Sequence, residues 1–572
     1  MKSLSLLCAL IGAAPLALPA LAQTPAKIAA IQGGDTSVLL NQSVTIEAVM
    51  TGNFLGAERF NGFYVQDPVG DGNPATSEGL FVYVNSNSPF AKIDIQPGDR
   101  VQIAGRVSRY KGQTQISSPT QIKVIAHGEP LAPQVVALTG EVNWESLEGM
   151  LVRFDQTLMV TEQYDMNRYG SVKLAPQRTF NPTNVRPLTE VKAAPLAIST
   201  ITLDDGSDDS YPKQLRYLDA NGTLRDGSTV TGLTGIVSEY NGEYRIEPTV
   251  DPVIADSNPR PIAPPEVGGT LKVAAANVLN YWTTFKDRDH PNARGADNAV
   301  QFERQSAKIV AELKGLDADI VGLMEVENNG ENTINELVKR LNAAYGAETY
   351  AVVPAPATGF GTDAIRVAMI YKPAKVELVG ASSSATDAIF DRLPFAQTFR
   401  DKGTQGVFTV VVNHFKSKGS PPKTPGDVNL DNGAGNWNAK RTQQAQRLVA
   451  FVQSLQKTSG DPDVLVIGDL NAYVEEDPLI ALRDAGLKHL NLRIPAEDRY
   501  SFSYDGMFGS LDHALATPSL DGQVTGFGEW HINADEPYFN VYDKIKVENY
   551  RPDPYRASDH DPLVVGLNLT AN

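Results

Sequence analysis

"VLVIGDLNAY", residues Val464–Tyr473, has the pattern of a buried strand that ends in two polar side chains. An apolar run leads to a glycine, and Asp469 and Asn471 then follow one residue apart. On a strand, side chains two residues apart project to the same face. We therefore expect Asp469 and Asn471 to reach into one site while Leu470 turns into the core.

Other segments of residues 270–570 have similar apolar strand patterns, and these strands alternate with amphipathic helices. LKVAAANVLNY (Leu271–Tyr281) and ADIVGLMEVEN (Ala318–Asn328) have the composition of buried strands. Between them, FERQSAKIVAELKGL (Phe302–Leu316) has one apolar face at helical spacing. Strands that alternate with helices predict a layered α/β domain.

Six strands of this region end near a polar residue that can handle a metal ion or a phosphate. Turns and helix caps also use such residues, which explains any single case, but six in one domain favour a shared site. Oxygen ligands without cysteine suit Mg²⁺, Mn²⁺ or Ca²⁺, and histidines beside carboxylates suit proton transfer. Together they predict metal-assisted hydrolysis of a phosphoester. The strand-end residues are Asn277, Glu325, His414, Asp469 with Asn471, Asp512, and Asp559 with His560.

The motifs around these residues resemble those of the endonuclease/exonuclease/phosphatase superfamily, and their order and spacing fit from about residue 270 to 570. The resemblance implies a four-layer α/β sandwich of the deoxyribonuclease-I-like type. NVLNYWTTF and NWNAKRTQQAQRLV are also similar to segments of bacterial secreted extracellular endonucleases. The superfamily motifs are AAANVLNYW, GLMEVENNG, NHFKSK, GDLNAY, SLDHALAT and SDHDPLVV.

The resemblance implies a role for each strand-end residue. Asn277 and Glu325 match the metal-binding asparagine and glutamate of the family, and Asp559 matches the aspartate close to the metal. His560, paired with Asp512, matches the histidine that positions or activates the attacking water.

His414 matches the second catalytic histidine of the family, which acts as general acid or phosphate ligand. Asp469 and Asn471 match the pair that orients the nucleophile and contacts the phosphoryl oxygens. In some members this aspartate is instead proposed as the base, so both roles stay open for Asp469. Asp363 is a candidate partner that orients His414, although nuclease relatives often have a glutamate there.

Cations near His414 are candidates for binding the substrate phosphate. Arg392 precedes a strand, in a position that resembles that of a phosphate-binding arginine of the family. The alternative interpretation is that Arg392 is an exposed loop arginine without this role. Lys416 and Lys418 follow His414 in NHFKSK and are the further candidates.

The loop of residues 417–441 has two features of its own. Asp427, Asn429 and Asp431 fall at every second residue, which is a candidate Ca²⁺ site. A solvated, turn-rich loop is the alternative. The loop is also locally basic, so it could bind a phosphodiester backbone while Trp437 stacks on a base.

The region before residue 257 is rich in short alternating strands and predicts two β domains, 27–135 and 136–256. GRVSRYKGQTQI and GIVSEYNGEYRI repeat at an offset of 130 residues, which favours two related small OB-like barrels. The first resembles the OB-like domain ahead of bacterial secreted nucleases. Two alternatives stay open for the function of these OB-like domains: they bind oligonucleotides, or they are spacers that present the enzyme. A proline-rich linker, 257–269, follows.

Residues 1–22 have the pattern of a secretory signal peptide, with an apolar run and Ala20-Leu21-Ala22 before Gln23. A transmembrane anchor is the alternative, but the run is short. We expect a secreted or periplasmic protein with no membrane insertion after cleavage. The only cysteine, Cys8, lies in this segment, so the mature chain is expected to have no disulfide.

The formal net charge of −17 excludes a general nucleic-acid coat protein, because phosphate binding needs cations. Our prediction is a secreted nuclease that uses Mg²⁺ or Mn²⁺, with Ca²⁺ as a further candidate. Its expected substrate is DNA, with RNA as an alternative, cut with little sequence specificity. The other interpretations are a phosphoesterase for phospholipids or small phosphate esters, and a catalytically dead binding protein. No obligate protein partner is implied.

Overall fold

The computed structural model describes residues 25–33, 39–194, 199–219, 222–546 and 549–571. The expected signal peptide therefore lies outside the described residues. The chain divides into two compact units. Unit 1 is Met1–Gln134, Asn143–Leu151 and Ile236–Glu243, and unit 2 is Val135–Val142, Val152–Gly235 and Tyr244–Asn572. No helix in the described part of the chain has the length and apolar character needed to cross a membrane.

Unit 1 is built around five strands that close into a ring, because the last strand in the order pairs back onto the first. Alternate residues such as Ile46, Val65 and Ile103 point inward and are fully buried. The identity of this ring as an OB-like domain stays a prediction. The ring order is β1 (Ser43–Phe54), β2 (Gly62–Gln66), β3 (Gly79–Tyr83), β5 (Gln113–Ala126) and β4 (Arg100–Tyr110), with α1 (Ile28–Gln32) and η1 (Glu145–Leu147) beside it in sequence.

Unit 2 begins with a β region whose strands belong to an open sheet, so the expected second OB-like barrel is not confirmed. The order within unit 2 is β14 (Val253–Ala255), β11 (Thr229–Thr231), β8 (Leu158–Glu162), β9 (Val172–Ala175), β10 (Ile201–Leu203) and β13 (Glu243–Val250). The other elements before residue 241 are β6 (Gln134–Val136), β7 (Leu151–Phe154), α2 (Met166–Tyr169), α3 (Pro182–Val185), α4 (Leu188–Ala193) and β12 (Thr234–Tyr240).

The rest of unit 2 contains two six-stranded sheets. The first has the order β17 (Ala351–Val352), β18 (Ile365–Tyr371), β16 (Ile320–Glu327), β15 (Leu271–Tyr281), β28 (Leu563–Leu567) and β27 (Val524–Glu529). The second has the order β19 (Val376–Ser384), β20 (Phe395–Asp401), β21 (Val407–His414), β22 (Val464–Asp469), β26 (Asp512–Ala516) and β23 (Lys488–His489).

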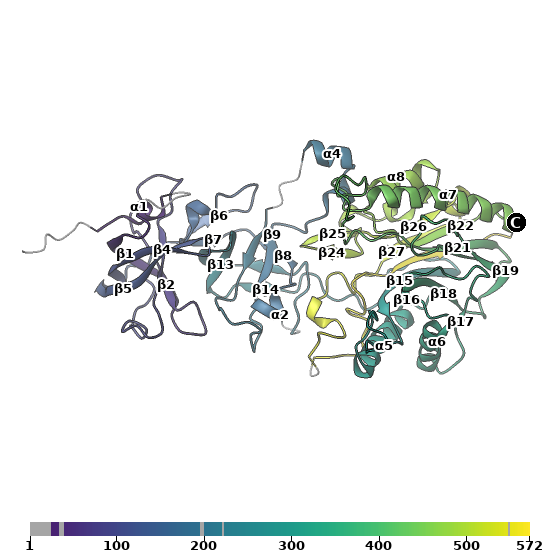
Figure 1. Cartoon of the computed structure of the whole chain (residues 1–572), viewed down its shortest axis with the longest axis horizontal. Coiled ribbons are helices and arrows are strands. Elements are labelled where there is room, and N and C mark those ends of the chain that lie inside the picture. Colours follow the sequence, from purple (N-terminus) through teal and green to yellow (C-terminus); the bar gives the residue numbers. More distant parts are fainter. Residues whose placement is uncertain (1–24, 34–38, 195–198, 220–221, 547–548, 572) are drawn as a thin grey trace, which may run out of the picture. The chain divides into compact units, whose positions relative to one another are not determined.

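The two sheets pack face to face and are covered by helices on their outer faces (Figure 1). Strand alternation explains the layers: Val273 and Ala275 of β15 lie in the core between the sheets, whereas Ala274 and Ala276 pack under helices. The helices are α5 (Ala299–Leu316) and α6 (Asn332–Tyr345) on the first sheet, and α7 (Asn438–Ser459) and α8 (Asp477–Asp484) on the second. Smaller elements are η2 (Leu490–Arg493), η3 (Ala496–Asp498), β24 (Phe502–Tyr504), β25 (Met507–Gly509), α9 (Pro518–Asp521) and η4 (Tyr538–Asn540).

The proline-rich segment 257–269 lies inside unit 2, between its β region and the two sheets. Hydrogen bonds join these parts directly: Thr183 Oγ1 donates to Glu476 Oε1 at 2.8 Å, and Asn184 Nδ2 donates to the Arg499 carbonyl at 3.0 Å. The β region of unit 2 is therefore packed onto the sandwich by buried polar contacts.

Gly468 of β22 is a position where only glycine fits. Its φ is +126°, and a Cβ added there would lie 2.2 Å from the Asn413 carbonyl oxygen on the neighbouring strand. Gly468→Ala is expected to lower the free energy of unfolding by about 3 kcal/mol, measured by urea denaturation. Gly419→Ala is the matched control, because nothing lies within 4 Å of the added methyl group. Equal stability of the two variants would contradict this account.

Candidate active site

A row of three polar side chains crosses the second sheet at one end. His414 of β21 is the register partner of Asp469 of β22, and Asp469 is the partner of Asp512 of β26. Residues in register on adjacent strands project to the same face. All three side chains are buried, so the sheet alone brings together three of the predicted catalytic residues.

Asn471 joins this row in a way that strand alternation did not predict. β22 ends at Asp469, and Asn471 has a left-handed backbone with φ 48°. Asp469 Oδ1 accepts a hydrogen bond from the Asn471 backbone N–H at 2.8 Å, and Asn471 Nδ2 donates to the Phe415 carbonyl at 3.2 Å. The pair is therefore held together by a turn, and the expectation of two successive positions on one strand face is wrong.

His560 lies against this row and forms a tight pair with Asp512. The His560 Nδ1 to Asp512 Oδ2 distance is 2.7 Å, and Ser501 Oγ donates to the same carboxylate oxygen at 2.7 Å. The His560 ring also contacts the Phe502 ring, with centroids 4.8 Å apart. The ligand atoms of Asp469, Asp512 and His560 lie within 4.8 Å of one another. The predicted His560–Asp512 pair is thus present as a geometry, and its catalytic role stays a prediction.

The charges around His560 favour its protonated form. Burial acts to lower the pKa of His560, but the carboxylates of Asp512, Asp469 and Asp559 outweigh it and raise the pKa well above its usual range. A base must be unprotonated to accept a proton. A divalent cation beside Asp559 would cancel part of the negative charge and bring the pKa of His560 down toward the working range of a base.

His414 has the opposite electrostatics. Burial first, and then the positive charges of Arg392 and His560, hold the pKa of His414 well below its usual range. His414 Nε2 lies 3.4 Å from Asp469 Oδ2, and His414 Nδ1 has no hydrogen-bond partner. A neutral imidazole is a poor general acid but donates a hydrogen bond, so of the two roles implied for His414 the phosphate ligand is favoured.

Asp469 is a carboxylate of this row whose pKa lies near neutral pH. Burial raises its pKa to about 7, and the charges of Asp512 and Glu325 add to the rise, while His560 and the Asn471 N–H oppose it. A pKa near 7 is compatible with both roles left open for Asp469: a base that takes the proton of the water, and a ligand that only holds the water.

The candidate metal ligands come from the first sheet. Asn277 of β15 and Glu325 of β16 lie on adjacent parallel strands, with Asn277 in register with Met324. Glu325 has a φ of 65°, and its Oε2 accepts from the Asn280 N–H at 2.9 Å. Burial, and then the negative charge of Asp559, raises the pKa of Glu325.

These residues fit a divalent cation. Like charges on Glu325 and Asp559 repel each other in a buried site, and a cation between such carboxylates relieves the repulsion. All the side-chain donor atoms here are hard oxygens, which suits Mg²⁺ or Mn²⁺. The group of Asp469, Asp512 and His560 is less suited, because the His560 imidazolium already supplies its positive charge.

Arg392 lies behind His414 and is buried. Its Nε donates to the His414 carbonyl at 3.2 Å, its Nη2 donates to the Phe415 carbonyl, and its Nη1 lies 3.6 Å from Asp363 Oδ2. The alternative of an exposed loop arginine is therefore wrong. Asp363 pairs with Arg392, so the prediction that it orients His414 is corrected: the charge it balances is that of the arginine.

Lys418 is engaged in the protein itself. Its Nζ donates to Glu476 Oε1 at 2.7 Å and to the Ala434 carbonyl at 2.6 Å, and burial lowers its pKa to about 8. The prediction that Lys418 binds the substrate phosphate is therefore not favoured. Lys416 remains half-buried, with its Nζ 5.1 Å from the centroid of the Trp437 ring.

The loop after His414 uses its acidic side chains to form turns. Asp427 Oδ1 accepts from the Asn429 N–H at 2.8 Å, and Asp431 Oδ1 accepts from the Gly433 N–H at 2.7 Å. Asn429 Oδ1 accepts from the Lys440 N–H at 2.9 Å. These oxygens already accept hydrogen bonds from nearby backbone N–H groups, which favours the turn-rich alternative over the Ca²⁺ site.

The comparisons with known proteins decide the family of this region. Residues 276–560 match the family model described as Endonuclease/Exonuclease/phosphatase family. This part of the chain is a domain of that family. Members of this family are hydrolytic phosphoesterases, which supports an enzyme. Residues 109–258 match a model described as Domain of unknown function (DUF8508). No curated protein matches the chain.

Solved structures similar to the family domain include the human Nocturnin catalytic domain, at 18% identity and a TM-score of 0.33 over 52% of this chain and 94% of that chain. An endonuclease/exonuclease/phosphatase family protein from Bacteroides thetaiotaomicron is similar at 16% identity and a TM-score of 0.35, over 52% and 95%. D. rerio TDP2 complexed with a single-strand DNA product is similar at 14% identity and a TM-score of 0.32, over 52% and 97%. At these identities and TM-scores, no conclusion rests on the three likenesses.

Asn533 is a residue of the family domain that no motif pointed to. Its Nδ2 donates to the His560 carbonyl at 2.7 Å, and its Oδ1 accepts from the Ala557 N–H at 2.9 Å. Asp561 Oδ1 accepts from the Asn533 N–H at 2.7 Å. Asn533 thus clamps the loop that carries His560. Asp561 lies inside the motif SDHDPLVV, so the sequence could have pointed to it. Asn533 lies in none of the motifs, so the sequence offered no signal for it.

Glu312 of α5 reaches the same clamp and makes stability depend on pH. It is buried, its Oε2 accepts from Asn533 Nδ2 at 3.3 Å, and burial raises its pKa to about 8 from 4.5. Between these two values the folded protein keeps a proton that the unfolded chain releases, so stability falls as pH rises through this window.

Glu312→Gln is expected to remove that loss, since glutamine keeps an oxygen acceptor for Asn533 and carries no titrating proton. The variant should match the wild type near pH 4 and exceed its free energy of unfolding by on the order of a few kcal/mol above about pH 8. Urea denaturation of both proteins across this range checks it. A constant difference between them at all pH values would be the contrary result.

Proposed function

We propose that the chain is a metal-dependent phosphodiesterase that hydrolyses nucleic acid, with DNA as the main substrate and RNA as an alternative. One observation carries the proposal: His560 is hydrogen-bonded to Asp512 beside the buried pair of Asp469 and His414. A histidine oriented by a carboxylate, next to a second carboxylate, is suited to directing water at a phosphorus atom.

Asn277, Glu325 and Asp559 would hold the metal. When bound, a divalent cation polarises a phosphoryl oxygen and neutralises charge that develops in the transition state. Mg²⁺ or Mn²⁺ is proposed for this site, with Ca²⁺ as a further candidate, because the oxygen donors suit all three ions.

The residues of this chain would then divide the work of hydrolysis. Water adds to phosphorus, the ester P–O bond breaks, and the departing alkoxide takes a proton from solvent water to leave as an alcohol. His560, held by Asp512, takes the proton from the water, while Asp469 and Asn471 hold that water and a phosphoryl oxygen. Neutral His414 donates its ring N–H to the phosphate.

A second candidate is a phosphoesterase of the same fold that acts on phospholipids or small phosphate esters. The half-buried Lys416 beside Trp437 favours nucleic acid, because a cation next to an aromatic ring suits a phosphate with a neighbouring base. A catalytically dead binding protein is the third, least favoured, reading.

The deciding experiment incubates the purified protein with plasmid DNA, RNA, sphingomyelin vesicles and a simple phosphomonoester, each with Mg²⁺, with Ca²⁺ and with EDTA. We expect cleavage of DNA with Mg²⁺ and none with EDTA. Hydrolysis of sphingomyelin or the phosphomonoester alone would favour the second candidate, and inactivity on every substrate would favour the binding protein.

We further propose that the protein is exported, on the basis of the signal-peptide pattern in residues 1–22. Expression in a Gram-negative host should give a mature protein that begins at Gln23 in the periplasm or medium. N-terminal sequencing checks this, and an intact Met1 on cytoplasmic protein would contradict it.

A further inference from the structure

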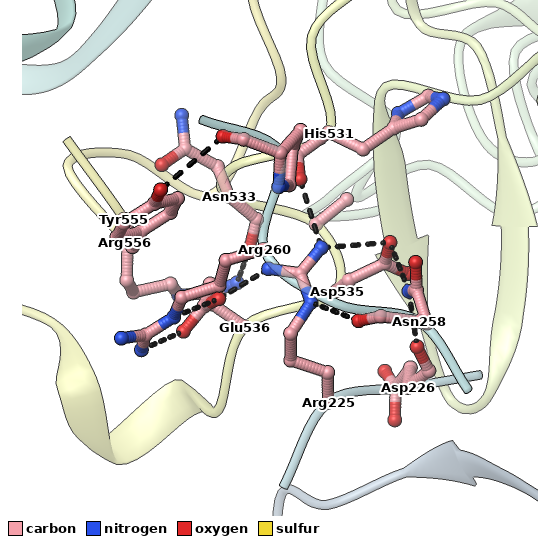
Figure 2. A network of polar contacts seen from close by, with 12 residues as sticks. Arg225, Asp226, Asn258, Arg260, His531, Asn533, Asp535, Glu536, Tyr555 and Arg556 are labelled. Atoms are coloured by element: carbon pink, nitrogen blue, oxygen red, sulfur yellow. Dashed lines mark hydrogen bonds and ion pairs between the residues drawn. The ribbon is translucent and has the colours of Figure 1, made fainter. Parts of the chain in front are cut away.

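The segment His531–Glu536, called the 531–536 segment below, lies between two parts of unit 2. On one side it contacts the β region that precedes the family domain. On the other it contacts residues 556–561, called the histidine loop, which carry Asp559 and His560. Figure 2 shows the residues that meet around it.

Arg225 of the β region uses its whole guanidinium group on this junction (Figure 2). Its Nη1 donates to Glu536 Oε1, and its Nη2 donates to the His531 carbonyl at 2.9 Å and to Asp535 Oδ2 at 3.3 Å. Its Nε donates to the Asn258 carbonyl at 3.0 Å. All three nitrogens of the guanidinium group are therefore hydrogen-bonded.

The acidic partners of Arg225 are fully buried and are shared with other arginines. Glu536 also accepts from Arg260, from its Nε at 2.9 Å and from its Nη2 at 2.6 Å. The side chains of Asp535 and Glu536 are 0% exposed, and that of Arg225 is 2% exposed. Arg178, also from the β region, donates to Asp535 Oδ1 at 2.6 Å. Burial would raise the pKa of Asp535, but the two arginines hold it at about 2. A buried carboxylate that loses its cation is strongly destabilised, so the segment keeps this conformation only with the arginines in place.

The other side of the 531–536 segment holds the histidine loop. Asp561 Oδ1 accepts from the N–H groups of Asn533 and Ala534, at 2.7 and 3.0 Å. Asn533 Nδ2 donates to the His560 carbonyl at 2.7 Å. Arg556 Nη1 donates to the Asn533 carbonyl at 2.6 Å. Arg225 is therefore connected to the backbone of His560 by hydrogen bonds and ion pairs on the two sides of the 531–536 segment, and by the covalent backbone of that segment between them.

We propose that Arg225 is a positioning residue for His560, acting through the 531–536 segment, and that the β region of unit 2 is in this way part of the catalytic unit. The inference rests on the proposed function, in which His560 directs the water. It goes beyond a spacer role for this region. A displacement of about 1 Å in a catalytic group costs on the order of 10²-fold in rate.

The test compares Arg225→Gln and Arg225→Lys with the wild type. Arg216→Gln is the matched control, because it removes an arginine of the same β region that pairs with the exposed Asp251 at 2.6 Å. For each full-length protein, kcat and KM are measured on bis(p-nitrophenyl) phosphate with Mg²⁺. Hydrogen–deuterium exchange is followed in peptides that cover the histidine loop, and thermal unfolding reports on folding.

We expect kcat to fall about 10²-fold in Arg225→Gln and about tenfold in Arg225→Lys, which keeps the charge but not the fork of donors. KM should change less than about twofold, because a positioning defect acts on the reacting group. A defect in folding alone would lower the active fraction without faster exchange in the histidine loop of the folded protein. Arg216→Gln should behave as the wild type.

Folded Arg225 variants with wild-type kcat, or with unchanged exchange in the histidine loop, would overturn the proposal. If Arg225→Gln does not fold, Arg225→Lys and the charge-matched double variant Arg225→Gln with Glu536→Gln decide it by the same measurements. If the wild type hydrolyses no phosphodiester, the proposed function fails, and the exchange data still decide whether Arg225 holds the histidine loop.

Discussion

His560→Ala is expected to lower kcat for DNA hydrolysis by about 10²–10⁴-fold while the protein stays folded. The His560 Nδ1 atom lies 2.7 Å from Asp512 Oδ2, so Nε2 is the ring nitrogen left for the attacking water, and alanine removes the group proposed to take its proton. Folding should tolerate the change because the loop is held by its backbone: the His560 carbonyl accepts from Asn533, and the Asp561 side chain accepts from two N–H groups.

The measurement is the initial rate of plasmid cleavage at saturating Mg²⁺, with circular dichroism and thermal unfolding as checks on the fold. His290→Ala is the matched control, since His290 is exposed and its ring pairs with the exposed Asp287 at 3.1 Å. Retention of the wild-type rate by His560→Ala would remove His560 from the mechanism and leave Asp469 as the base.

Glu325→Gln is expected to weaken Mg²⁺ binding and to lower kcat by on the order of 10³-fold at low Mg²⁺. Glutamine keeps an oxygen that can accept from the Asn280 N–H, so the shape of the site is preserved and only the charge is lost. The loss of this charge also removes the repulsion between Glu325 and Asp559. A bound cation then has less repulsion to relieve, so Mg²⁺ binding is weaker.

Titration of activity against Mg²⁺, together with calorimetric binding of Mg²⁺, separates affinity from catalysis. Glu377→Gln is the control, because Glu377 is 47% exposed and pairs with Arg400 at the far edge of the second sheet. An unchanged Mg²⁺ dependence in Glu325→Gln would show that the metal is held elsewhere, and the group of Asp469, Asp512 and His560 would then be the next candidate.

The chemistry of single strand ends could be predicted from the sequence, because each depends on a few neighbouring residues. VLVIGDLNAY gave the correct element, since β22 runs from Val464 to Asp469. The prediction that Asn471 projects from the same strand face as Asp469 was wrong for a local reason. The strand ends at Asp469, and Asn471 has a left-handed backbone conformation. A period-two rule holds only as long as the strand does.

Contacts between distant segments could not be predicted in the same way. The row of His414, Asp469 and Asp512 depends on which strands are neighbours and in what register, and one sequence does not contain that information. Arg225 and Asn533 are the extreme case. Neither lies in a motif. Arg225 meets His531, which is 306 residues later in the chain, and Asn533 meets Glu312, which is 221 residues earlier.

The charged residues after His414 show why composition alone misleads. Lys416 and Lys418 are equivalent in the sequence, two cations next to a catalytic histidine. In the structure one remains near an aromatic ring and the other is buried against Glu476. Both lysines lie beyond the end of β21 at His414, so strand alternation does not set their directions. What packs around each of them decides the difference, and the pattern NHFKSK does not specify it.

The order of the site residues along the chain has a consequence for the cell that makes the protein. Asn277 lies on β15, among the first strands of the sandwich to be synthesised, while Asp559 and His560 immediately precede β28, which pairs with β15. With the proposed roles, a chain that is still emerging from the ribosome has no complete site, because the water-directing histidine has not been made. Under the proposed function, hydrolytic activity therefore begins only after β28 has joined β15.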